Sequence, residues 1–264
     1  MRIIDFRARP NTKEYMDLYP GTRSWDLYFH CPKPEPEPLS SFIAALDKVG
    51  VGQAVFTGRQ SPRTKLSNDY VAECVAAYPD RLFAFAGIDP TQGTAALKEI
   101  ERTVLKLGFK GISLDPHHIK AYADDRLLYP LYYKCLELDV PVIFTMGPIV
   151  GKWAAPLGID NVATDLPNLK IICSHGVWPQ VTELLALAYK HENVYLEASI
   201  YEFLSGAEPI FDAANGFLQD KIIYASGFPF RPLDDIHRFL KYKFDQGAAE
   251  KVVYQNAARL LGIS

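Results

Sequence analysis

A chain of 264 residues, of which 48% are hydrophobic and 22% charged, is long enough to bury a large core, and we expect residues 1–264 to form a single domain. The formal net charge of -3 argues against a nucleic-acid partner, which needs a basic surface. No apolar run approaches the roughly 20 residues of a membrane helix and no secretion signal begins the chain, so we expect a cytoplasmic protein without a membrane partner.

Short apolar runs alternate with amphipathic stretches along the chain. The runs expected to form strands are residues 2–6, 53–57, 82–88, 111–115, 142–145, 170–173, 194–197 and 222–224. Apolar residues recur three and four positions apart, as in amphipathic helices, in residues 68–78, 91–107, 128–138 and 180–191. This alternation predicts an α/β fold, a single (β/α)8 TIM barrel with parallel strands.

The first connection, residues 11–39, is much longer than an ordinary βα loop. It carries aromatic residues such as Tyr15, Tyr19 and Trp25, and it ends in a proline-rich run at residues 32–38 that is typical of an extended spacer. A loop of this kind is either a lid over a ligand or a contact with a neighbouring subunit, and a homodimer stays open as the oligomer.

Polar residues follow the predicted strands at the end where TIM barrels carry their chemistry. The first strand offers Asp5, Arg7 and Arg9, which share one face by alternation, and the second strand leads to Arg59. The later strands end in further polar residues, namely Asp115, Thr145, His175, Glu197 and Ser226.

The arginines predict an anion site. A guanidinium has no lone pair for a metal ion, whereas its fork of N–H groups matches the two oxygens of a carboxylate. We therefore assign substrate binding to six residues: Arg7, Arg9, Arg59, Thr145, Glu197 and Ser226. The alternative is that Arg7 and Arg9 only form buried ion pairs with Asp5, Asp115 or Glu197.

Proton transfer is assigned to His175, whose imidazole titrates near neutral pH, and to Asp115, which ends an apolar strand. His117 and His118 are adjacent in sequence, and neighbouring residues of an extended chain point apart. We therefore expect at most one of these two imidazoles to face the site.

Several segments resemble the amidohydrolase superfamily, in the branch that includes aminocarboxymuconate-semialdehyde decarboxylase and pyrone-dicarboxylate lactonase. The family's first strand reads Ile-Ile-Asp-Phe-His-Ala-His-Pro, with two metal-binding histidines, and this chain has Arg7 and Arg9 at those positions. Thr145 stands where the fifth strand carries a metal-binding histidine, and Gly227 stands where the eighth strand carries an aspartate. His175 keeps the histidine of the sixth strand, and residues 255–261 match the C-terminal helix.

This resemblance implies a TIM-barrel enzyme for a small anionic substrate. With most metal ligands replaced, we expect a hydrolase that needs no cofactor and acts on a carboxylate-bearing lactone or cyclic acid. Two alternatives stay open. One is a metal-dependent hydrolase or decarboxylase with one divalent ion, such as zinc, in a rebuilt site of Asp5, His117, His175 and Glu197. The other is a noncatalytic ligand-binding or scaffold barrel.

Overall fold

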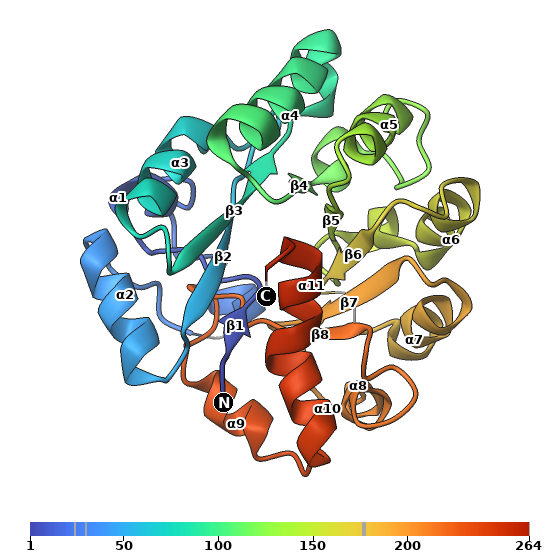
Figure 1. The fold of residues 1–264 in the computed structure, drawn as a ribbon. Coiled ribbons are helices and arrows are strands. Elements are labelled where there is room, and N and C mark those ends of the chain that lie inside the picture. The colour runs from blue at the N-terminus through green and yellow to red at the C-terminus, as the bar shows by residue number, and fades with distance from the viewer. Residues whose placement is uncertain (24, 30, 176–177, 264) are drawn as a thin grey trace.

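Eight parallel strands follow one another in chain order around a barrel (Figure 1). The computed structural model describes all residues except 24, 30, 176–177 and 264. The strands are β1 (Ile4–Asp5), β2 (Gln53–Thr57), β3 (Leu82–Gly87), β4 (Ile112–Leu114), β5 (Val142–Thr145), β6 (Ile171–Ser174), β7 (Val194–Ala198) and β8 (Ile222–Tyr224). The Phe6 N–H donates to the Tyr224 carbonyl at 3.1 Å, which joins the first strand to the last. The predicted TIM barrel is confirmed.

Helices surround the sheet on its outer side (Figure 1). In the described residues the α-helices are α1 (Lys13–Met16), α2 (Leu39–Lys48), α3 (Asn68–Ala77), α4 (Thr94–Leu107), α5 (Tyr129–Glu137), α6 (Pro156–Asp165), α7 (Val181–Lys190), α8 (Pro209–Ala214), α9 (Asp235–Leu240), α10 (Gln246–Glu250) and α11 (Asn256–Leu261). Short 3-10 or π turns are η1 (Trp25–Phe29), η2 (Pro90–Gln92), η3 (Pro116–Ile119), η4 (Gly151–Ala154) and η5 (Lys251–Gln255).

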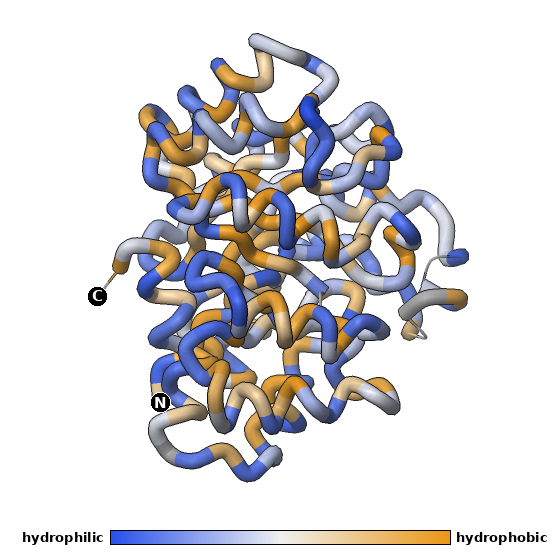
Figure 2. Tube along the Cα trace, turned by 90° about the vertical axis from the view of Figure 1, so that its right-hand side faces the viewer, coloured by the Kyte–Doolittle hydropathy of each residue, from blue (hydrophilic) through white to orange (hydrophobic). Residues whose placement is uncertain are grey.

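Burial of both faces explains why the strand sequences are almost entirely apolar. Every residue of β5 and β6 is buried, as expected for parallel strands that helices cover outside and side chains fill inside. Hydrophobic residues accordingly gather in the middle of the molecule (Figure 2). The helix α4 turns Ala96 and Ile100 toward this core and ends at Gly108, whose φ of 71° is the left-handed conformation that glycine adopts readily.

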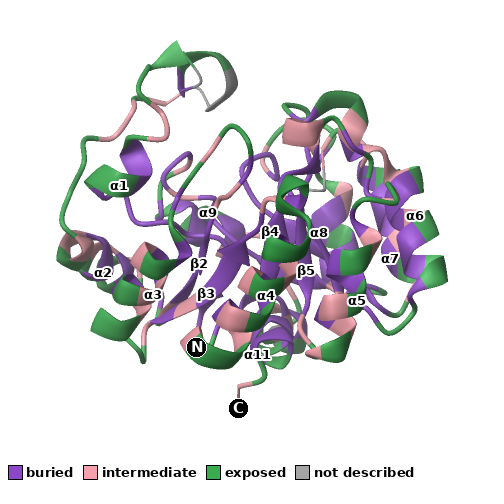
Figure 3. Ribbon diagram, turned by 90° about the horizontal axis from the view of Figure 1, so that it is seen from above, coloured by how far each residue is buried: buried purple, intermediate pink, exposed green. Residues whose placement is uncertain are grey.

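The two ends of the barrel are covered differently. Near the start of β1, the Arg2 guanidinium lies 4.0 Å from the ring centre of Tyr254 in η5, so the C-terminal helices cover the N-terminal end. At the opposite end, the first connection contains α1 and η1 and rises above the strands (Figure 3). Across the described parts of the chain, no helix combines the length and the apolar character that a bilayer crossing requires.

Candidate active site

A cavity of about 230 Å³ opens at the C-terminal ends of the strands, where TIM barrels carry their active sites. Its lining comes from the first connection and from the segments that follow β2, β4, β5, β6, β7 and β8. The polar lining includes Tyr19, Arg59, His117, His118, Thr145 and His175. The rest of the wall is largely apolar, with Met146, Ile149, Val150, Ile200 and Phe230. This combination suits a small organic acid.

Arg59 forms a charged wall of this cavity. Its Nε and Nη2 donate to Asp115 Oδ2 at 3.2 and 3.0 Å, and its Nη1 donates to the Tyr19 hydroxyl. Burial tends to raise the pKa of Asp115, but the positive charge of Arg59 outweighs that effect and holds this pKa well below its usual range. Asp115 is therefore a permanent anion that fixes Arg59, and such a carboxylate is a weak base.

Arg7 is almost fully buried and reaches the cavity wall through Thr145. Its Nη2 donates to Thr145 Oγ1 at 3.1 Å, and its Nε lies 3.9 Å from Glu197 Oε2. Burial and the neighbouring charge of Arg9 lower the pKa of Arg7 to about 9, so the guanidinium is still a cation at neutral pH. The pairing with Glu197 agrees in part with the ion-pair interpretation of this arginine.

Arg9 has no such partner. Its side chain is 1% exposed, its Nε donates to the Thr57 carbonyl at 3.3 Å, and its guanidinium lies 5.9 Å from the ring centre of Tyr15. No carboxylate among the described residues forms an ion pair with Arg9, and its Nη2 has no hydrogen-bond partner there. A buried cation without an ion-pair partner is costly, so this position points to an anionic ligand.

His175 follows β6 and lines the cavity. Its backbone has a φ of 57°, a conformation that non-glycine residues adopt rarely and mostly at functional sites. Burial and the charges of Arg7 and Arg9 hold the pKa of this imidazole well below 6.5, so it is neutral at pH 7. Its Nδ1 shares a hydrogen bond with Ser199 Oγ, a residue that the sequence analysis did not identify.

The expectation that only one of His117 and His118 faces the site is wrong. Both imidazoles line the cavity, with ring centres 4.2 Å apart. The physical reason is the backbone, because these residues belong to the 3-10 turn η3 and not to an extended strand. His118 Nδ1 shares a hydrogen bond with Ser61 Oγ at 2.7 Å, which fixes one of the rings.

Glu197 and Ser226 do not line the cavity. Glu197 is buried beside Arg7, and burial raises the pKa of its carboxyl while the charge of Arg7 opposes that shift. Ser226 Oγ accepts from the Phe228 N–H at 3.0 Å, and the Ser226 N–H donates to Asp5 Oδ1 at 2.9 Å. Direct substrate contact by either residue remains a prediction.

The residues at the barrel mouth do not suit a divalent ion. Of the rebuilt ligand set, Asp5 is already held by the backbone N–H groups of Arg7 and Ser226. Over the described residues, no three histidine, cysteine, aspartate or glutamate side chains come together as a metal site. Arg7 and Arg9, which follow the first strand, are cations and would repel a divalent ion at the same place.

Gly227 occupies a position where a side chain would meet Ile200. The φ of Gly227 is 75°, and a Cβ built there would lie 2.5 Å from Ile200 Cγ1. Ile200 is itself a β-branched residue with a φ of 65°, and it packs against the core while bordering the cavity. An aspartate at position 227 would therefore collide with Ile200.

We predict that Gly227→Ala destabilises the protein more than Gly50→Ala. Both glycines have a φ of 75°, but a Cβ at Gly50 has no heavy atom within 4 Å. The left-handed conformation should cost each variant about 1–2 kcal/mol, and the Ile200 contact should add about 1–3 kcal/mol at position 227 only. Urea unfolding measures both losses. Equal losses in the two variants would show that the Ile200 contact relaxes freely.

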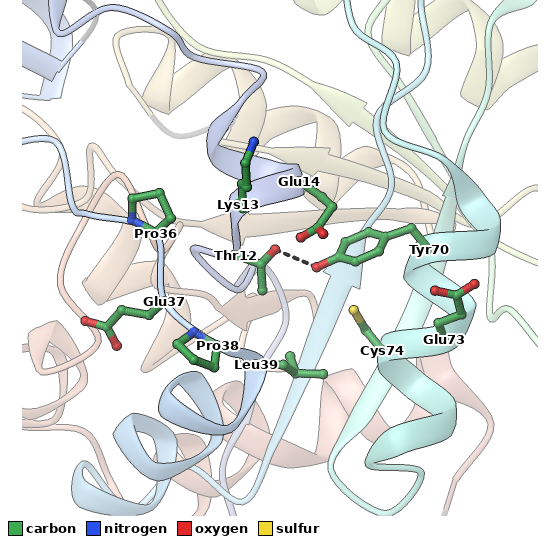
Figure 4. Close-up of a pocket in the computed structure, with 10 residues that line it drawn as sticks. All are labelled: Thr12, Lys13, Glu14, Pro36, Glu37, Pro38, Leu39, Tyr70, Glu73 and Cys74. Atoms are coloured by element: carbon green, nitrogen blue, oxygen red, sulfur yellow. Dashed lines mark hydrogen bonds between the residues drawn. The ribbon is translucent and has the colours of Figure 1, made fainter.

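A larger cavity, of about 490 Å³, lies between the first connection and α3 (Figure 4). The Tyr70 hydroxyl donates to Thr12 Oγ1 at 2.5 Å within it, and Glu14 and Glu73 flank that tyrosine. Glu37 adds another carboxylate, and Lys13 is the one cation among the described lining residues. Carboxylates repel an anionic ligand, so the smaller cavity beside the arginines is the better candidate.

Comparisons with known proteins agree with this geometry. A family model described as amidohydrolase matches residues 20–263. An uncharacterised TIM-barrel protein from Bordetella bronchiseptica has a TM-score of 0.90 and 31% identity over 99% of both chains. The dihydroxybenzoic acid decarboxylase of Polaromonas sp., solved with bound manganese and 2-nitroresorcinol, has a TM-score of 0.71 and 20% identity, covering 99% of this chain and 97% of that one. At that identity the likeness shows the fold alone.

Two characterised relatives are similar in sequence. Gamma-resorcylate decarboxylase of Polaromonas sp. is 23% identical over 281 residues, which cover 86% of this chain and 84% of the relative. The 2-keto-4-carboxy-3-hexenedioate hydratase of Sphingobium sp. is 30% identical over 141 residues, 44% of this chain. That match spans only 40% of the hydratase.

Proposed function

Because the chain belongs to the amidohydrolase family, we propose that it is a lyase that adds water to, or removes it from, a small unsaturated carboxylic acid. The named relatives are decarboxylases and a hydratase, which are lyases and not hydrolases. They support lyase chemistry over the lactone hydrolysis expected from the sequence. The observation that carries the proposal is Arg9, a buried cation that forms no ion pair with any described carboxylate.

The arginines bind the substrate carboxylate. The rest of the substrate occupies the 230 Å³ cavity, and its carboxylate lies at the floor, where Thr145 lines the cavity and accepts from Arg7. Arg7 Nη1 and Arg9 Nη2 have no hydrogen-bond partner among the described residues, so both are available as donors. A carboxylate there gains charge-assisted hydrogen bonds and relieves the burial cost of Arg9.

This placement favours water addition over loss of the same carboxylate. When water adds to a carbon–carbon double bond conjugated with a carboxylate, the electron pair of the double bond moves toward that carboxylate. The two guanidiniums then stabilise the charge that develops in the transition state. In decarboxylation the charge leaves the carboxylate, and the same contacts would stabilise the ground state instead.

His175 moves the proton. The neutral imidazole removes a proton from water as the oxygen bonds to the substrate's β-carbon, and the imidazolium then returns a proton to the α-carbon. Arg59 contacts a second polar group of the substrate, while Asp115 and Tyr19 hold its guanidinium in place. The pKa of Asp115 is too low for efficient proton removal, so His175 is the main acid and base.

A second candidate is decarboxylation of a hydroxybenzoate. It is favoured by the alignment with gamma-resorcylate decarboxylase over most of the chain. In that reaction the arginines would hold the phenolate oxygens, where negative charge collects, and not the departing carboxylate.

A substrate screen tests the proposal. Purified protein is incubated in ¹⁸O-labelled water with unsaturated carboxylates, hydroxybenzoates and lactones, and products are followed by mass spectrometry and carbon dioxide release. We expect one ¹⁸O atom in the product of an unsaturated carboxylate, without carbon dioxide. Carbon dioxide release from hydroxybenzoates alone would favour the second candidate, and lactone opening alone would restore the hydrolase.

A further inference from the structure

The contact between His175 and Ser199 joins the ends of two neighbouring strands. Ser174, the residue before His175, pairs in register with Glu197 of β7, and Ser199 follows two residues later. Both His175 and Ser199 are buried, and the hydrogen bond links His175 Nδ1 to Ser199 Oγ. Nε2 has no hydrogen bond to any residue that the structure describes, and His175 lines the cavity, so Nε2 is the nitrogen left for the substrate.

Glu197 offers an acceptor for the proton of the Ser199 hydroxyl. It lies two residues before Ser199, on the same face of the strand, and the nearby hydroxyls of Ser174 and Ser199 both lower the pKa of its carboxyl, against the larger effect of burial. No hydrogen bond of normal geometry occupies either carboxylate oxygen of Glu197 in the described part of the chain, so both oxygens are available as acceptors. A serine hydroxyl has one proton to give, and a carboxylate is the strongest acceptor close to it.

We infer that Ser199 is a positioning residue, which turns its proton toward Glu197 and accepts the Nδ1–H of His175. The imidazole is thereby held in the tautomer whose Nε2 carries a lone pair toward the cavity. In this state Nε2 can take a proton from water, so the inference deepens the proposed function and rests on it for its catalytic meaning. The tautomer itself can be observed without any substrate.

Nitrogen NMR of ¹⁵N-histidine-labelled protein tests this inference at pH 7, where His175 is neutral. The His175 signals are assigned from their loss in His175→Asn. We expect Nδ1 to be protonated in the wild type, and we expect Ser199→Ala to shift the population toward protonated Nε2. Glu197→Gln should have the same direction of effect, because an amide is a weaker acceptor than a carboxylate.

Matched variants separate positioning from packing. Ser199→Thr retains the hydroxyl and should keep the wild-type tautomer, whereas the equally shaped Ser199→Val should lose it. Ser113→Ala removes a buried serine hydroxyl from β4 and should leave His175 unchanged. Protonated Nε2 in the wild type, or identical tautomers in the Thr and Val variants, would overturn the inference.

The two proposals fail separately. The expected tautomers together with no turnover of any unsaturated carboxylate would reject the proposed function and retain the role of Ser199. Water addition by a protein with protonated Nε2 would reject the role of Ser199 and retain the function.

Discussion

Replacing Arg9 by methionine is expected to weaken carboxylate binding by about 10- to 150-fold, the equivalent of about 1.5–3 kcal/mol for a charge-assisted hydrogen bond. The same substitution should leave the free energy of unfolding unchanged or raise it. Methionine fills a similar volume, and the described structure gives Arg9 no carboxylate that the change would leave unpaired. Calorimetric titration with fumarate and benzoate measures binding, and urea unfolding measures stability.

The control is Arg2→Met, at the opposite end of the barrel, where the arginine stacks on Tyr254. It should leave carboxylate affinity unchanged. A large loss of stability in Arg9→Met, with affinity intact, would support the ion-pair interpretation of the arginines.

Replacing His175 by asparagine is expected to lower kcat by about 10²- to 10⁴-fold, the usual contribution of a general acid or base. In the wild type, activity should fall on the acid side as the imidazole takes up a proton. Burial and the arginine charges hold the His175 pKa below 6.5, so the acid limb of kcat/KM should also lie below pH 6.5. A bound carboxylate offsets those charges, so the corresponding limb of kcat should lie at higher pH.

Arg9 should influence the pH dependence of kcat/KM. Arg9→Met removes one of the charges that lower the His175 pKa, so the acid limb of kcat/KM should move to higher pH in that variant. His237→Asn, at an exposed position on α9, is the matched control and should keep wild-type kcat. Unchanged turnover in His175→Asn would remove this residue from the mechanism.

The barrel was predictable because its strands have strong signals. The ranges predicted for β2, β5 and β8 match the observed bounds, since each run is apolar, short and ended by turn residues. The helices α8 and α9 were not predicted, because each has only six residues and too little periodicity to stand out. The first strand is shorter than expected, with only Ile4–Asp5 in regular pairing.

The candidate site was predictable where residues follow directly from strand ends. Arg59, Thr145 and His175 line the cavity, whereas Arg7 and Arg9 are buried and do not belong to its lining. Ser199 was missed although its spacing from Glu197 places both on one face, because a serine carries no functional signal by itself. A side chain at position 227 would clash with Ile200 because of the backbone angles there, and no sequence pattern reveals those angles.

This chain shares its fold with the related structures, and the function proposed for it uses arginines to stabilise negative charge. The Polaromonas decarboxylase structure contains manganese, while this chain has guanidiniums at the two first-strand positions that are histidines in the family motif. A bound metal ion and an arginine side chain can have the same catalytic role, because each stabilises negative charge that develops on the substrate. In the function proposed for this chain, Arg7 and Arg9 stabilise that charge, so the proposal depends on their geometry.

Turnover after complete metal removal tests most directly whether arginines bind the substrate in place of a divalent ion. Protein dialysed against a chelator and checked by elemental analysis is assayed with the substrate found in the screen, with and without added Mn²⁺ or Zn²⁺. We predict the same kcat/KM in all samples. Activity that is lost on dialysis and returns with one of these ions would contradict the account.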